Sequence, residues 1–215
     1  MTADGAASVD FNLYLITDRG VTGERDLLAV VAEALAGGVP AVQLREKALS
    51  SRDYFDLARE LRGLTARYHT RLLINDRVDI ALAVGADGVH LPESGMPVGA
   101  ARKLLGPRRL IGVSCHSQEK AAAAAEQGAD FITYGPVYET PSKAAYGAPV
   151  GITSLAGVVR SLSLPVFALG GITRDRVPEL LAAGIHRVAL ISAILAAPAP
   201  KAEAEAFTTL LHKAA

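Results

Sequence analysis

The chain has 215 residues and half of them are hydrophobic, which is enough apolar material for the core of one globular domain. Its 22 Lys and Arg residues balance its 22 Asp and Glu residues, so no overall charge favours nucleic acid or an anionic membrane as a partner. A single cysteine, Cys115, excludes an internal disulfide bond, and we find neither a membrane span nor a signal peptide. These features predict a cytoplasmic protein.

Short apolar runs alternate with longer amphipathic segments along the chain. The runs are rich in Val, Ile and Leu, as is typical of strands buried on both faces of a parallel sheet. We expect eight strands, at residues 11–17, 40–45, 71–75, 87–91, 109–114, 130–135, 165–170 and 187–192.

Between the runs, apolar residues recur at helical spacing. We expect helices at residues 24–36, 52–68, 117–127, 153–161, 174–183 and 201–212. Eight strands, alternating with helices, favour an α/β fold with a single (β/α)8 TIM barrel over an open parallel sheet of five or six strands. We expect residues 1–10 to form a flexible N-terminal tail and residues 11–215 to form the barrel.

Glycine and serine residues follow the last two predicted strands. In TIM barrels, the loops after strands seven and eight commonly form a phosphate site, because free backbone N–H groups attract an anion. The sequence therefore predicts a phosphate-binding site. Ordinary turn glycines and a helix-capping serine would give the same sequence pattern. The residues in question are Gly170, Gly171, Ile191 and Ser192.

Polar residues end strands two and three. Alternation along a strand points Gln43, Arg45 and Lys47 the same way, toward a bound ligand. The alternative is an internal ion pair of Arg45 with Glu46 or Asp76. Asn75 and Asp76 end strand three, where Asp76 could bind magnesium or simply cap the next helix.

Two further candidates lie after strands five and six. Ser114 could contact a ligand, and His116 is the best acid–base candidate because its ordinary pKa is near neutral. The loop of residues 138–150 holds Thr140, Ser142 and Lys143, which would suit an anion clamp that closes on substrate. A solvated loop would explain the same composition.

The ordered motifs QLREK, IND, DGVHL, GVSCHS, YGPVYETPSK, ALGGI and LIS resemble those of the thiamine phosphate synthase/TenI family, from about residue 13 to residue 212. The resemblance implies a thiazole phosphate as ligand and two possible activities. One is a synthase that couples hydroxymethylpyrimidine diphosphate to thiazole phosphate with Mg²⁺ and releases pyrophosphate. The other is a TenI-like thiazole tautomerase, which needs no metal.

Residue matching divides between the two activities. Matches to the synthase's pyrophosphate or pyrimidine contacts fall at Arg45, Lys47, Asn75, Ser114, Thr140, Ser142 and Lys143. Asp76 matches its first magnesium carboxylate, but the second falls at Gly95, which has no side chain; Glu93 is the nearest replacement. The Leu-Pro pair after strand four, Glu139-Thr140 and Arg77 look closer to TenI.

Because of the missing carboxylate, we expect a TenI-like tautomerase, an isomerase without cofactor in which His116 moves the proton. A Mg²⁺-dependent synthase and a non-catalytic binder of thiazole or thiamine phosphates are the alternatives. The Ala-rich outer helices would permit a homodimer.

Overall fold

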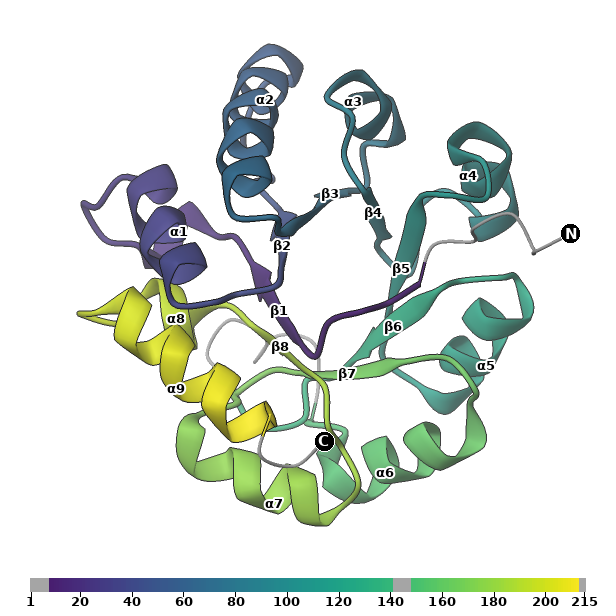
Figure 1. Ribbon diagram of the computed structural model, residues 1–215. Helices are drawn as coiled ribbons and strands as arrows, with labels where there is room; N and C mark the ends of the chain where they lie inside the picture. Colours follow the sequence, from purple (N-terminus) through teal and green to yellow (C-terminus); the bar gives the residue numbers. More distant parts are fainter. Residues whose placement is uncertain (1–7, 141–147, 213–215) are drawn as a thin grey trace, which may run out of the picture.

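The computed structural model describes residues 8–140 and 148–212. Eight parallel strands close into a barrel in the order β1 to β8, and β8 pairs with β1 (Figure 1). This confirms the predicted (β/α)8 barrel. Of the expected tail at residues 1–10, residues 1–7 lie outside the described residues. Asp10, at its other end, forms an ion pair with Arg71 at 2.8 Å.

All eight predicted strands are present, most of them trimmed at their ends. They are β1 (Leu13–Ile16), β2 (Ala41–Leu44), β3 (Arg71–Asn75), β4 (Gly88–Leu91), β5 (Leu110–Cys115), β6 (Phe131–Tyr134), β7 (Val166–Leu169) and β8 (Val188–Leu190).

Helices surround the barrel in an outer layer (Figure 1). The predicted ones are α1 (Leu27–Ala36), α2 (Ser51–Arg67), α5 (Gln118–Glu126), α6 (Gly151–Ser161), α7 (Val177–Ala182) and α9 (Pro200–His212), with the short α8 (Ser192–Leu195) after β8. Two more, α3 (Val78–Ala83) and α4 (Val98–Leu105), were not predicted. Their N-cap residues, Arg77 and Pro97, make no side-chain capping hydrogen bond, so the usual start signal is absent. No helix in the described ranges is long and apolar enough to cross a membrane.

The core has two layers, because successive strand residues point to opposite faces. Leu15, Leu44 and many other aliphatic side chains pack between the strands and the helices. Inside the barrel, Phe11, Tyr14 and Phe131 pack together with Phe167, at ring-centroid separations of 5.2 to 5.9 Å. This aromatic cluster fills the interior, so the barrel has no pore and ligands must bind at an end.

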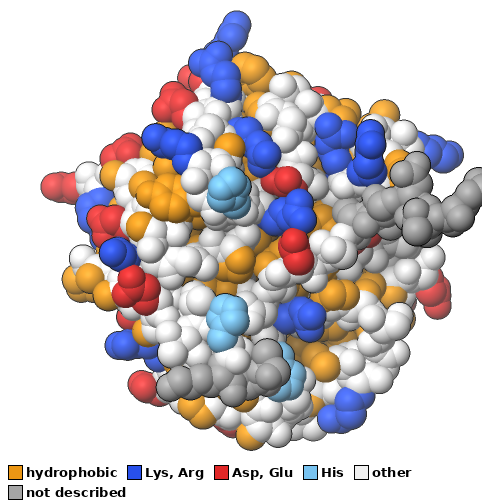
Figure 2. All heavy atoms as spheres, in the orientation of Figure 1, with side chains coloured by type: hydrophobic (Ala, Val, Ile, Leu, Met, Phe, Trp, Pro, Cys, Tyr) orange, Lys and Arg blue, Asp and Glu red, His pale blue; other side chains and the backbone are white. Residues whose placement is uncertain are grey.

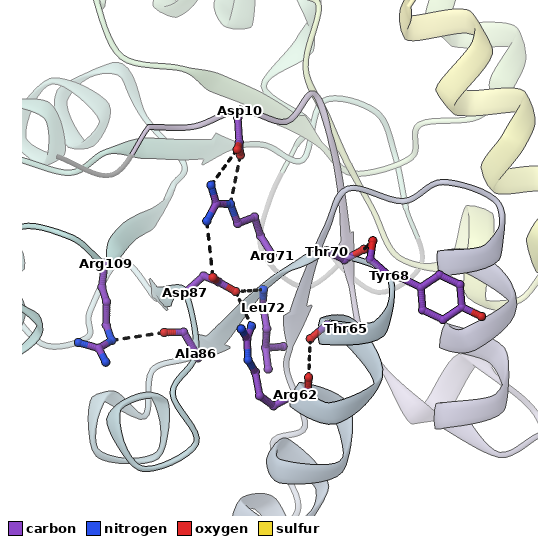
Figure 3. A network of polar contacts seen from close by, with 10 residues as sticks. All are labelled: Asp10, Arg62, Thr65, Tyr68, Thr70, Arg71, Leu72, Ala86, Asp87 and Arg109. Carbon is purple, nitrogen blue, oxygen red and sulfur yellow. Dashed lines mark hydrogen bonds and ion pairs between the residues drawn. The ribbon is translucent and has the colours of Figure 1, made fainter. Parts of the chain in front are cut away.

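The end where the strands begin, called the N-terminal end below, faces the viewer in Figure 1, where the first described residues cross it. An ion-pair network around Asp87 lies at this end, next to α2 (Figure 3). The Asp87 carboxylate accepts from the Arg62 guanidinium at 2.6 Å and from the Leu72 N–H at 2.8 Å. Arg71 lies 3.6 Å from the other Asp87 oxygen and also pairs with Asp10. Figure 2 shows positive and negative side chains side by side over this end.

Candidate active site

The predicted site residues gather at the opposite end of the barrel. All strands are parallel, so the residues that end β2, β3, β5, β7 and β8 meet at one C-terminal rim. Hydrogen-bond register places Asn75 beside His90, and Ser114 beside Thr133. Ser142 and Lys143 lie outside the described residues, and Thr140 is half-buried at the edge of that gap.

Gln43 lies deeper than a simple ligand contact would require. Its side chain is inside the barrel, 1% exposed, and its amide nitrogen donates to the Tyr14 hydroxyl at 3.0 Å. Burial raises the pKa of Tyr14 far above its usual range, so the phenol keeps its proton. The Gln43 amide nitrogen is therefore already hydrogen-bonded inside the barrel.

Arg45 remains free of a carboxylate partner. Its guanidinium makes no ion pair or side-chain hydrogen bond with the described part of the chain, so the expected alternative of a pair with Glu46 or Asp76 is not observed. Glu46 instead accepts from the Thr17 hydroxyl at 2.9 Å and from the Arg19 N–H at 3.3 Å. Burial is the main cause that raises the Glu46 pKa. An uncompensated guanidinium at the rim suits an anionic ligand.

Lys47 does not follow the predicted alternation. β2 ends at Leu44, so the period of two no longer applies three residues later, where Lys47 lies in an exposed turn. Lys47 follows β2 at the C-terminal rim, but the strand does not orient its side chain.

Asp76 has an unusual backbone conformation. Its φ is +63°, in the left-handed region that Asp and Asn tolerate better than other non-glycine residues. Its N–H donates to the His90 carbonyl at 2.9 Å, which holds this conformation. The alternative role as a helix cap is wrong, because the N-cap of α3 is Arg77. Within the described residues, the Asp76 carboxylate has no ion pair and accepts no side-chain hydrogen bond.

Position 95 lies directly beside this carboxylate. A Cβ placed on Gly95 would lie 3.1 Å from Asp76 Oδ1 and 2.8 Å from Pro92 Cδ. A carboxylate side chain at this position would bind a cation together with Asp76, and Gly95 has no side chain to do so. The described residues contain no cluster of three or more His, Cys, Asp or Glu side chains placed to hold a metal. One protein carboxylate still fits Mg²⁺, which commonly takes its other ligands from substrate phosphates and water.

His116 forms a pair with the carboxylate that could have replaced the missing one. Glu93 Oε2 accepts from the His116 backbone N–H at 3.1 Å and lies 2.9 Å from His116 Nδ1. The His116 side chain is 42% exposed at the rim. Glu93 Oε2 is therefore already engaged by His116.

His90, inside the barrel, is a polar residue that the sequence analysis did not single out. It is 1% exposed, and its Nε2 lies 3.0 Å from Ser114 Oγ and 3.4 Å from Thr133 Oγ1. Burial, and next the charge of Arg45, lower its pKa to about 3. A signal was available in the sequence: alternation along residues 87–91 points His90 inward, where an apolar residue would be usual.

The loop after β7 packs so closely against the β6 loop that two of its positions leave no room for a side chain. Gly170 and Gly171 have φ values of +101° and +68°. A Cβ on Gly170 would lie 2.6 Å from the Pro136 side chain, and one on Gly171 would lie 2.8 Å from the Glu139 carbonyl oxygen. Both positions therefore require glycine. Ile191 precedes α8 and Ser192 begins it, exposed at the same rim.

Comparisons with known proteins agree with this geometry. The chain is 65% identical over 205 residues to the "Putative thiamine-phosphate synthase" of Geobacter sulfurreducens, covering 95% of this chain and 96% of that protein. It is 42% identical to the "Thiamine-phosphate synthase" of Clostridium novyi, covering 87% and 92% of the two chains. The solved "Thiamine phosphate pyrophosphorylase from Pyrococcus furiosus" superposes with a TM-score of 0.85 at 36% identity, covering 94% and 96%.

These relatives correct the expected activity. We expected a TenI-like tautomerase, an isomerase. The similar proteins match over nearly their whole length, and they are named as thiamine-phosphate synthases or, for the solved structure, as a thiamine phosphate pyrophosphorylase. Arg77, one of the residues that suggested TenI, pairs with Asp79 at 2.6 Å and with Ser51, and so reflects local packing.

The sequence model described as "Thiamine monophosphate synthase" (TMP-TENI) matches residues 13–194, most of the barrel. The chain belongs to this family.

Proposed function

We propose that this protein is a thiamine-phosphate synthase, a transferase that joins hydroxymethylpyrimidine diphosphate to thiazole phosphate and releases pyrophosphate. One observation carries the proposal: Arg45 and Asp76 lie at the ends of neighbouring strands, and neither has an ion-pair partner among the described residues. A free guanidinium beside a free carboxylate suits a diphosphate that arrives with a divalent cation.

The reaction breaks the bond between the pyrimidine's methylene carbon and a diphosphate oxygen, and the electron pair leaves with the pyrophosphate. The thiazole ring nitrogen supplies its lone pair to the same carbon and forms the new C–N bond. The protein's main task is therefore to stabilise negative charge on the departing diphosphate. Arg45 would bind this group directly, and the exposed Lys47 would add a second positive charge at the rim.

Mg²⁺ would supply charge neutralisation at the diphosphate when bound. Asp76 would hold it, and the diphosphate oxygens would complete its coordination in place of the carboxylate that Gly95 lacks. Asn75, the last residue of β3, would contact the pyrimidine diphosphate beside it.

The thiazole phosphate would bind on the other side of the rim. Gly170, Gly171 and Ile191 would bring backbone groups close to its phosphate, and Ser192 would add a hydroxyl at the start of α8. Thr140, with Ser142 and Lys143 outside the described residues, would contact the pyrophosphate from the β6 loop. The small-molecule substrates suit a cytoplasmic protein.

The test is the formation of thiamine phosphate by purified protein from both substrates, with Mg²⁺ and with EDTA. We expect product with Mg²⁺ and none with EDTA. Binding of thiazole phosphate without any product would instead identify a non-catalytic binder and contradict the proposal.

A further inference from the structure

A line of buried polar groups lies directly beneath the proposed site. His90 on β4 points its Nε2 toward two hydroxyls on the next two strands, Ser114 on β5 and Thr133 on β6. Thr133 is 1% exposed, whereas Ser114 is half-buried and lies where β5 reaches the rim. Ser114 therefore connects the closed interior to the ligand side.

The His90 ring is confined to this position by its neighbours. The ring centroids of Tyr14 and Phe131 lie 5.8 and 5.6 Å from that of His90. On the far side, a Cβ on Gly112 would lie 2.6 Å from His90 Nδ1 and 2.3 Å from Phe131 Cζ, so only glycine leaves room. His90 Nδ1 is buried and has no hydrogen-bond partner in the described chain.

This environment decides which nitrogen carries the proton. The ring is buried and no carboxylate among the described residues contacts it, so His90 is neutral and has one N–H. A proton on Nδ1 would leave a buried donor without an acceptor, which is rare in folded proteins. A proton on Nε2 can be donated to Ser114 Oγ, 3.0 Å away.

We infer that His90 is a positioning residue that donates its Nε2–H to Ser114 Oγ, so that Ser114 directs its own proton out of the barrel toward the pyrimidine diphosphate. The inference rests on the proposed function for the identity of that ligand. If His90 Nε2 carried no proton, it would be an acceptor, and the Ser114 hydroxyl would donate inward to it and offer the ligand only a lone pair. An oxygen lone pair repels an anionic ligand, whereas a donated hydroxyl proton attracts it.

The first experiment reads the hydrogen bond without substrate. Long-range ¹H–¹⁵N spectra of ¹⁵N-histidine-labelled protein distinguish the two neutral imidazole forms. We expect the Nε2–H form for His90, and a shift of its Nε2 signal in Ser114→Ala. A proton on Nδ1 would overturn the inference.

The second experiment measures thiamine phosphate formation by variants. His90→Gln keeps an N–H near the position of Nε2, whereas His90→Leu fills the space without a donor. We expect His90→Leu to lower kcat/KM about tenfold, the effect of losing one hydrogen bond, and His90→Gln to retain most activity. The matched control Thr133→Val, which removes the longer contact, should change kcat/KM less than twofold.

A double-variant comparison separates positioning from simple structural damage. If His90 acts through Ser114, His90→Leu should cost less than twofold when Ser114 is already Ala. Independent, multiplying losses in variants with unchanged Tm would overturn the inference. Absence of thiamine phosphate from the wild-type reaction would refute the proposed function, whereas the imidazole spectrum would still decide the hydrogen bond.

Discussion

The two ends of this barrel differ in how completely their charges are paired, although the C-terminal rim also holds the Arg19–Glu46 and Glu93–His116 pairs. At the N-terminal end, Asp87 is bound by Arg62 and by a backbone N–H and lies near Arg71, which also pairs with Asp10. At the C-terminal rim, Arg45 and Asp76 have no such partners among the described residues.

Backbone strain does not divide between the ends in the same way. Asp76 and the glycines after β7 have positive φ values at the C-terminal rim, but so do His69 and Gly38 in the loops of the N-terminal end. The contrast therefore rests on unpaired charge, which natural proteins keep where a ligand repays it. We infer that the N-terminal end contributes stability, and we propose that the C-terminal end carries the reaction.

The substitution with the largest expected effect at the C-terminal rim is Asp76→Asn. Asn tolerates the left-handed backbone, so only the charge is lost. We expect kcat/KM for thiamine phosphate formation to fall about 10³-fold, the scale of losing a group that organises transition-state charge, with Tm unchanged. An active variant would mean that the rim carboxylate does not serve the reaction.

Asp87→Asn makes the matching change at the other end. It weakens two guanidinium contacts, in which the Arg62 and Arg71 side chains are about a third or more exposed, so we expect a loss of about 2 kcal/mol in the free energy of unfolding, with kcat/KM unchanged. The control is Asp79→Asn, in an exposed pair with Arg77, which should cost under about 1 kcal/mol. Equal losses in urea denaturation would argue against a special role for Asp87.

The interior histidine should make stability depend on pH. Its folded-state pKa is about 3, below the unfolded value of about 6.5, so the unfolded chain takes up a proton first as the pH falls. Its contribution should lower the free energy of unfolding by about 2 kcal/mol between pH 6.5 and 5. The His90→Gln variant should lack this part of the pH slope, and an unchanged slope would show that His90 does not cause it.

Gly95→Asp tests whether Asp76 binds a metal ion at the C-terminal rim. The new carboxylate would stand beside Asp76, so we expect the Mg²⁺ concentration for half-maximal activity to fall about tenfold. Gly95→Ala has the same Cβ contact with Pro92 but no charge, and controls for the local shift. An identical effect of both variants would contradict a metal at Asp76.

Much of the fold could be predicted because hydrophobic periodicity is a local signal. All eight strands and six of the helices follow from it. α3 and α4 were missed because they are short and their first residues offer no capping side chain.

The site was harder to predict because its details depend on contacts between distant residues. The sequence places Arg45, Asn75, Asp76 and Ser114 at the rim, but it cannot show that Glu46 is held by Arg19, 27 residues away. The choice of a tautomerase gave Gly95 too much weight, since Mg²⁺ can take ligands from its substrate.

The most direct measurement is a ³¹P NMR time course of the wild-type protein with both substrates and Mg²⁺. We predict that the diphosphate signals of the pyrimidine substrate disappear at the rate at which pyrophosphate and thiamine phosphate appear, in equal amounts, and that EDTA stops all three changes. Unchanged diphosphate signals, or pyrophosphate release without thiamine phosphate, would contradict the assignment of this barrel as a synthase.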